Sequence, residues 1–232
     1  MLFKTKHFDI IHGDGVFKIN TDALLLGSLC PINPGRALDI GTGSGIIALI
    51  LAQRDEGINI DAIDNDLRSI NVAKENFQNS KFSDRLQAEH ADIANLDPSV
   101  LYSTIITNPP YYISGLQKLD SQLQKKHAID STLPKTMAKK IHSLLAKDGV
   151  FSIICNDIYL IELINYLDKY QIKLDEKIEI YGRPSKPMQQ VIGVFRRKID
   201  YPKTKNSQLY IYNEKGAKTE EYLQLMRPYL FV

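Results

Sequence analysis

The sequence lacks the residue patterns of several whole classes of protein. Among its 232 residues only two are cysteines, Cys30 and Cys155, and they form no CxxC pair. The histidines are not clustered, so we expect no disulfide framework, no zinc ribbon and no metal site. Both cysteines are therefore expected to be small buried residues of a protein in the reducing cytoplasm.

Long apolar runs are missing as well. The longest, residues 46–52, is far shorter than a membrane span, and residues 1–20 mix Lys, His and Asp with apolar positions, unlike a signal peptide. There is no internal repeat or low-complexity tract, and 44% of the residues are hydrophobic. This composition excludes a chain that is disordered or collagen-like as a whole. The simplest organisation is one domain over residues 1–232, with an N-terminal extension over residues 1–33.

The net charge is only +2, but the charges are segregated along the chain. Residues 56–100 hold nine acids and four bases, whereas residues 117–147 hold seven lysines and two aspartates. Residues 183–205 hold seven bases and one acid. This distribution suggests that one side of the protein binds a cation and another binds a large anion such as nucleic acid. Solvent-exposed helix faces would give the same distribution of charges.

Short apolar runs alternate with amphipathic stretches from residue 36 onward, which predicts an α/β fold with a mostly parallel, doubly wound sheet. Ligands in such folds bind at the carboxyl ends of the strands. Strands are expected at 37–40, 58–63, 87–90, 104–107, 150–155, 172–180 and 191–195. Helices are expected at 45–54, 67–78, from a cap at Ser131 or Thr132 to a stop at Gly149, and at 158–167.

A glycine-rich loop, Asp39-Ile40-Gly41-Thr42-Gly43-Ser44-Gly45, follows the first of these strands. Its spacing fits neither the GxGxxG dinucleotide fingerprint nor the P-loop. Asp39 is placed to bind a ligand amine or the loop itself, or simply to cap the next helix. The second strand ends in Asp64, where a carboxylate can accept hydrogen bonds from ribose hydroxyls. Asp92, after the third strand, can meet an adenine amino group, or it can be an ordinary loop residue.

A second motif, Asn108-Pro109-Pro110-Tyr111, follows the strand at 104–107. Two prolines make a rigid extended loop, which is also its plain structural explanation. Asn108 adds a carbonyl acceptor and Tyr111 a flat face for a ring. If the Asn108 side-chain oxygen and the Pro109 carbonyl each accept one hydrogen of a planar amine, its lone pair turns toward an electrophilic methyl group.

At these residues the chain resembles the class I S-adenosylmethionine-dependent methyltransferases, which implies a Rossmann-like, seven-stranded sheet. The loop at Asn108 resembles that of the enzymes that methylate amino groups of adenine, cytosine, guanine or glutamine. The resemblance implies that Asn108, Pro109, Pro110 and Tyr111 form the catalytic loop. The residues expected to bind S-adenosylmethionine are Lys18, Thr21, Asp22, Asp39, Gly41, Thr42, Gly43, Gly45, Asp64, Asn65, Asp92, Ile93 and Asn108.

Over almost its full length the chain resembles one family in particular, the bacterial tRNA(Val) adenine-N(6) methyltransferases. The segments that carry this resemblance are residues 3–27, the Asn108 loop, Lys125-Lys126-His127 and residues 219–230. It implies a tRNA partner and no obligate protein partner. We expect RNA contacts from Lys118, Lys125, Lys126 and His127, with a possible second patch at Arg196 and Arg197 that fits equally well with a solvated sheet edge.

The sequence leaves three alternative functions open. Methylation of a ribosomal RNA base uses the same chemistry, and only the terminal segments argue against it. A protein glutamine methyltransferase usually has a helical substrate domain ahead of the cofactor domain, and about thirty residues are too few to form one. A sensor that binds the cofactor without catalysis would have no use for the amine acceptors at Asn108.

Overall fold

The computed structural model describes residues 1–12, 19–109, 133–197 and 203–231. Within these residues one sheet has eight strands in the order β10-β8-β9-β7-β6-β3-β4-β5. β9 is antiparallel to both of its neighbours, and the other strands share one direction. The strands are β3 (Arg36–Ile40), β4 (Asn59–Asp64), β5 (Leu86–His90), β6 (Tyr102–Thr107), β7 (Leu145–Cys155), β8 (Ile172–Tyr181), β9 (Met188–Arg197) and β10 (Lys205–Tyr210).

The α/β class and the mostly parallel sheet are confirmed, but the predicted number of seven strands is wrong. The additional strand, β10, lies at the sheet edge beside β8. Its sequence, KNSQLY, is mostly polar, and only Leu209 is buried. A strand with so few apolar residues has no hydrophobic pattern from which it could be predicted.

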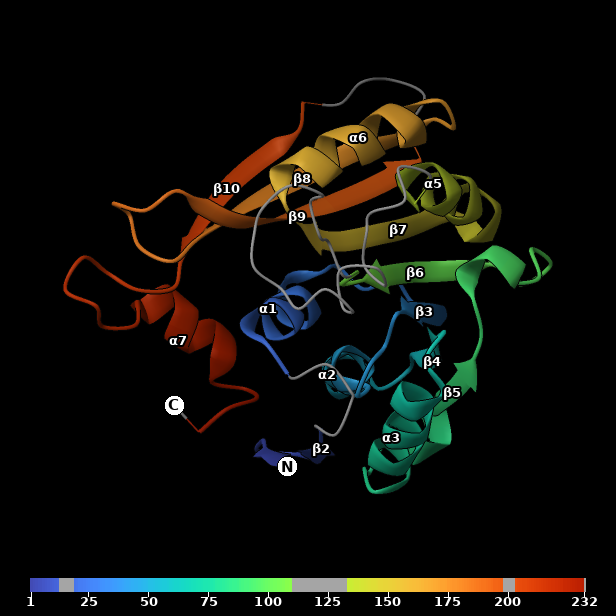
Figure 1. Cartoon of the computed structure of the whole chain (residues 1–232), viewed down its shortest axis with the longest axis horizontal. Helices are drawn as coiled ribbons and strands as arrows, with labels where there is room; N and C mark the ends of the chain where they lie inside the picture. The colour runs from blue at the N-terminus through green and yellow to red at the C-terminus, as the bar shows by residue number, and fades with distance from the viewer. Residues whose placement is uncertain (13–18, 110–132, 198–202, 232) are drawn as a thin grey trace, which may run out of the picture.

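Helices cover both faces of the sheet (Figure 1). One hydrophobic cluster joins the sheet to α1 (Thr21–Leu29), α2 (Ile46–Arg54), α3 (Leu67–Gln78) and α7 (Glu220–Met226). A second cluster joins the other face to α5 (Leu133–Leu144) and α6 (Asp157–Asp168). Because both faces are covered, four of the five residues of β3 and five of the six residues of β6 are buried.

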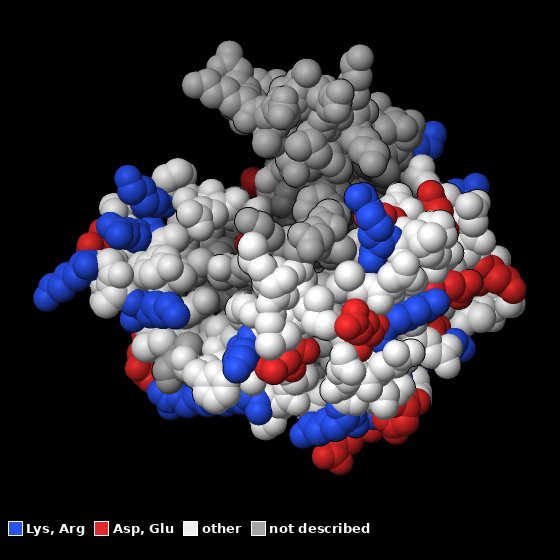
Figure 2. Space-filling model, turned by 60° about the horizontal axis from the view of Figure 1, so that its bottom comes forward, with Lys and Arg blue, Asp and Glu red and all other residues white. Residues whose placement is uncertain are grey.

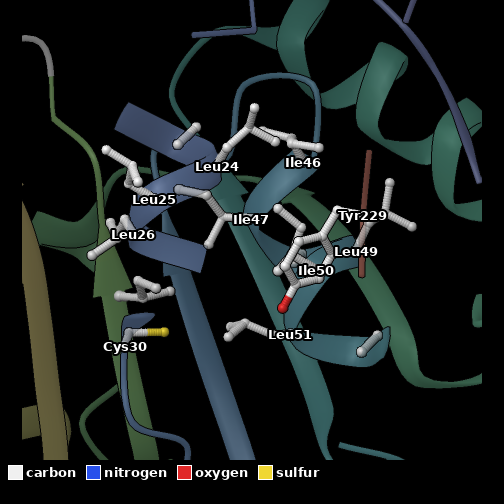
Figure 3. Close-up of a cluster of buried hydrophobic side chains, with 14 of the residues drawn as sticks. Leu24, Leu25, Leu26, Cys30, Ile46, Ile47, Leu49, Ile50, Leu51 and Tyr229 are labelled. Atoms are coloured by element: carbon white, nitrogen blue, oxygen red, sulfur yellow. The ribbon is translucent and has the colours of Figure 1, made fainter. Parts of the chain in front are cut away.

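Buried side chains of α1 and α2 pack together under the first face (Figure 3). Leu25, Leu26, Leu49, Ile50 and Leu51 are all fully buried there. α1 approaches α2 so closely that a Cβ at Gly27 would lie 3.1 Å from the Ile50 side chain. The two cysteines are buried and free, as predicted.

The N-terminal extension begins with a small antiparallel hairpin of β1 (Leu2–Lys4) and β2 (Asp9–Ile11). It lies beside the C-terminal segment, and Figure 1 shows both ends of the chain on the same side. The amide of Lys6 donates to the Tyr229 carbonyl at 2.9 Å, and Lys6 Nζ donates to the Arg227 carbonyl at 2.7 Å. The two ends of the sequence thus stabilise one another.

One predicted boundary is wrong for a physical reason. The helix expected to continue to Gly149 ends at Leu144, because the chain from Leu145 onward pairs with β6 as strand β7. At α1, which was not among the predicted helices, the cap is Asn20, whose Oδ1 accepts from the Ala23 amide at 2.9 Å. Thr21 and Asp22 lie in the first turn of this helix.

Candidate active site

The glycine-rich loop turns between β3 and α2 with left-handed backbone at three glycines. The φ angles are +71° at Gly41, +56° at Gly43 and +83° at Gly45, which side chains other than glycine rarely adopt. A Cβ at Gly45 would lie 2.4 Å from the Phe77 ring, so this glycine also lets α3 pack closely. A Cβ at Gly41 or Gly43 would meet no atom of the described residues within 4 Å. This exposed stretch of backbone is therefore open to close approach by a ligand.

The loop is fixed by hydrogen bonds to the end of the neighbouring strand. The amides of Gly41 and Thr42 donate to the Ile63 carbonyl at 2.8 and 3.0 Å. The Gly43 amide donates to Asp64 Oδ2 at 2.9 Å, while Asp64 Oδ1 accepts from the Asp66 amide. Each carboxylate oxygen has a second lone pair, so Asp64 can hold the loop and still accept ribose hydroxyls.

Asp39, the fourth residue of β3, is fully buried, and its carboxyl lies near the Ala48 amide in the first turn of α2. Its Oδ2 accepts a hydrogen bond from Thr42 Oγ1 at 2.7 Å, whereas Oδ1 has no hydrogen-bond partner among the described residues. Burial, reinforced by the charge of Asp64, raises the pKa of Asp39 to about 7, against the lowering effects of Thr42 and the nearby Ala48 amide. A buried oxygen with no partner is costly unless a ligand or water supplies a donor.

The loops after β4 and β5 complete this side of the site. The Ala91 amide donates to the Asp64 carbonyl at 3.1 Å, and His90 Nε2 lies 3.0 Å from the Asn65 carbonyl oxygen. Asp92 is exposed, and its Oδ1 accepts from the Ala94 amide at 2.8 Å as the cap of a short 3-10 helix, Ile93–Asn95. The structure therefore brings Asp64, Asn65, Asp92 and Ile93 to one edge, as the sequence predicted.

Asp22 reaches the same edge from α1. Its Oδ2 accepts from Gln190 Nε2 at 3.2 Å, and Gln190 lies near the start of β9, beside the carboxyl end of β7. Burial raises the pKa of Asp22. Thr21 precedes it in the first turn of the helix, and both residues, which the sequence predicted to bind the cofactor, are half-buried.

The predicted catalytic loop begins beside the glycine loop. Thr107, the last residue of β6, pairs with Ile40, and its Oγ1 donates to the Ile40 carbonyl at 2.9 Å. Asn108 and Gly41 are the next residues of these two neighbouring strands, and Asn108 and Pro109 are half-buried there. The remaining predicted residues Pro110, Tyr111, Lys18, Lys118, Lys125, Lys126 and His127 lie outside the described residues.

Arg196 and Arg197 are not part of this assembly. They lie at the end of β9, where Arg196 pairs with Val150 and Arg197 with Ile172, the first residue of β8. This is the amino edge of the parallel strands, opposite the glycine loop. Arg196 forms an ion pair with Asp175 at 3.3 Å, and Arg197 Nη2 donates to the Leu145 carbonyl at 3.0 Å. RNA binding by these two arginines stays a prediction, and it would take place far from the site.

Asn76 is an important residue that the sequence did not point to. It lies in α3 and is 1% exposed. Its Nδ2 donates to the Ser44 carbonyl at 2.8 Å and to the Ile11 carbonyl at 2.9 Å, and its Oδ1 accepts from the Ile11 amide at 2.8 Å. Asn76 thus joins the glycine loop to strand β2. A lone Asn on a helix has no distinguishing pattern, since its partners are distant in sequence.

The donor and acceptor set fits S-adenosylmethionine. Asp64 offers acceptors for vicinal hydroxyls, and the glycine loop exposes backbone that only glycine leaves open. Asp39 has a buried oxygen without a partner, and Asp22 adds a second carboxylate near α1. These groups, from four different parts of the chain, meet at the carboxyl edge where α/β sheets bind ligands.

The family model described as methyltransferase small domain matches residues 8–164. The chain belongs to this family. This is a family of S-adenosylmethionine-dependent methyltransferases, so the cofactor prediction is confirmed. Within the described residues no helix is long and apolar enough to span a membrane.

Curated relatives of this methyltransferase identify a more specific family. A protein of Flavobacterium psychrophilum named tRNA1(Val) (adenine(37)-N6)-methyltransferase is 30% identical, with 97% of each chain covered. A protein of Vibrio campbellii with the same name is 37% identical over 153 residues, which are 66% of this chain and 64% of that protein. The family resemblance predicted from the sequence is confirmed by these relatives.

Solved structures support the fold of this methyltransferase independently. The crystal structure of a predicted O-methyltransferase from Agrobacterium tumefaciens superposes with a TM-score of 0.70 and covers 90% of this chain and 96% of that protein. Its sequence identity is 18%, so the similarity concerns the fold alone.

Proposed function

We propose that this enzyme transfers a methyl group from S-adenosylmethionine to the exocyclic amino group of adenine 37, next to the anticodon, in tRNA(Val). The observation that carries the proposal is the position of Asn108-Pro109 directly after β6, beside the glycine loop, because it places amine acceptors next to the cofactor residues. The names of the full-length relatives supply the substrate.

The cofactor side of the reaction depends on groups already in place. Asp64 binds the ribose hydroxyls, Asp92 the adenine amino group, and the glycine loop presents its backbone to the methionine part. Asp39 and Asp22 offer carboxylate oxygens to the ligand amine. When bound, S-adenosylmethionine supplies an electrophilic methyl group on a sulfonium, and the protein supplies orientation.

The catalytic loop orients the nucleophile. The lone pair of an adenine amino group is delocalised into the ring and is poorly aimed for attack. The Asn108 side-chain oxygen and the Pro109 carbonyl each accept one amine hydrogen, which directs the lone pair out of the ring plane. The same two acceptors stabilise the positive charge that develops on the nitrogen. Tyr111 provides the face on which the unstacked base rests.

The chain forms one domain in this proposal, and residues 1–33 belong to the cofactor site rather than to a separate unit. Three contacts support this organisation. Asn76 joins β2 to the glycine loop, Asp22 contacts Gln190 of β9, and Lys6 contacts the C-terminal segment. We place the enzyme in the cytoplasm, with its tRNA substrate.

The test is methyl transfer from radiolabelled S-adenosylmethionine to unmodified total tRNA, ribosomal RNA and a protein extract, followed by nucleoside analysis. We expect label in tRNA as N6-methyladenosine. Label found only in ribosomal RNA would keep the chemistry and change the substrate. Label in protein would favour glutamine methylation, and no label despite cofactor binding would favour a sensor.

A further inference from the structure

Four exposed basic side chains lie at the carboxyl edge of the sheet, the edge that also carries the candidate active site. They are distant from the glycine loop. Arg183 and Lys186 lie in the connection from β8 to β9, and Lys215 and Lys218 lie in the connection from β10 to α7. Figure 2 shows Lys and Arg side chains gathered at the left of the view, the side on which Figure 1 draws these connections. We call these four residues the basic surface.

The two connections form one structure. The Tyr212 amide donates to the Gly182 carbonyl at 2.9 Å, and Ser185 Oγ donates to Glu214 Oε2 at 2.8 Å. Arg183 lies over Gly216, where an added Cβ would be 3.1 Å from its Nη2. The positions of the four bases are therefore fixed relative to each other by the loop backbones.

The fold sorts the basic run at residues 183–205 into two groups. β9 has ten residues, which correspond to about 30 Å of extended chain. Arg183 and Lys186 precede it at the carboxyl edge, where β7, β8 and β10 also end. Arg196 and Arg197 end β9 at the opposite edge, and Lys203 and Lys205 follow it there, at the start of β10. Only the first group shares an edge with Asn108.

The charges of the basic surface are also free to meet a ligand. Among the described residues none of the four bases forms an ion pair, and Lys218 Nζ lies 5.5 Å from the centre of the Tyr222 ring. Arg196, by contrast, is paired with Asp175. Glu214 is the one acid in the two connections, residues 182–187 and 212–218, and it accepts from Ser185.

We propose that the basic surface binds the phosphate backbone of the RNA whose adenine enters at Asn108. The proposal rests on the proposed function. β8 is separated from β6 by three strand spacings, about 14 Å in total, so the phosphate backbone of a folded RNA can reach the basic surface while its adenine lies at Asn108. Phosphates are the natural counter-charge for exposed Lys and Arg, and their contacts set orientation rather than sequence preference.

The test compares two charge-neutralised enzymes. One carries R183Q, K186Q, K215Q and K218Q; its control carries K147Q, K169Q, K203Q and K205Q, four exposed lysines toward the opposite edge. We expect the KM for tRNA to rise at least about tenfold in the first enzyme only. The dependence of log KM on log salt should also flatten by about 0.7–0.9 for each lost contact. The Kd for S-adenosylmethionine should be unchanged in both enzymes.

Equal KM values in the two enzymes, or equal losses, would overturn the proposal. Pairs of substitutions, R183Q with K186Q and K215Q with K218Q, separate a local folding defect from lost binding, because each pair should give part of the effect with an unchanged melting temperature. If the unmodified enzyme does not methylate tRNA at all, the proposed function fails first, and the two failures remain distinct.

Discussion

Two carboxylates at adjacent strand ends have different tasks because their surroundings differ. Asp64 is half-buried and accepts two backbone amides, so its charge is well solvated by the protein. Asp39 is fully buried, accepts a hydrogen bond from Thr42, and has a raised pKa. The sequence places both residues at the site, but it gives no measure of burial and therefore could not distinguish them.

The raised pKa of Asp39 predicts a specific pH dependence of stability. Between pH 4 and pH 7 the folded protein keeps a proton that the unfolded chain has released, so the free energy of unfolding falls as pH rises. Asp39→Asn removes this titration. In urea unfolding at pH 5 to 8, wild type should lose stability relative to the variant, by at most about 1.4 kcal/mol per pH unit, up to pH 7. A constant difference would contradict the raised pKa.

Substitutions at Asn108 and Asp64 should separate chemistry from binding. Asn108→Ala removes one amine acceptor, so we expect kcat to fall at least about a hundredfold while the Kd for S-adenosylmethionine changes little. Asp64→Ala removes the ribose acceptor and the Gly43 partner, which should weaken cofactor binding about 10- to 100-fold. Titration calorimetry and single-turnover assays measure the two effects. Near-normal turnover of Asn108→Ala would exclude the acceptor mechanism.

At the scale of elements, the sequence predicts what is locally patterned and misses what long-range contacts create. The strands around the glycine loop have buried apolar centres, and α3 has a clear apolar stripe, so their positions are close to those expected. β1, β2 and β10 are short or polar and form by pairing with partners found only in the fold. Strand pairing likewise ended α5 early, at Leu144.

Asn76 tests how the elements cooperate at the site. Asn76→Ala leaves the Ser44 carbonyl and both backbone groups of Ile11 without their side-chain partner. We expect a loss of about 2–4 kcal/mol in the free energy of unfolding, and weaker binding of S-adenosylmethionine with little change in kcat. Asn71→Ala, at an exposed position of the same helix, is the control and should change stability by less than about 0.5 kcal/mol. Unaltered cofactor affinity in Asn76→Ala would show that β2 and the glycine loop act independently.

For the whole molecule, the sheet determines which parts of the sequence work together. The carboxyl ends of β3, β4, β5 and β6 gather the residues that we propose bind the cofactor and the substrate amine, as expected from the alternation of strands and helices along the sequence. The same sheet divides one basic run between two edges, which no count of charges along the sequence could reveal.

The most direct test of the account is the site of methylation on one pure tRNA. Transcripts of tRNA(Val) with adenine or guanine at position 37 are incubated with enzyme and S-adenosylmethionine, digested, and analysed by mass spectrometry. We expect one N6-methyladenosine at position 37 in the first transcript and no methylation of the second. Methylation that persists when position 37 is guanine, or that falls on a ring nitrogen, would contradict it.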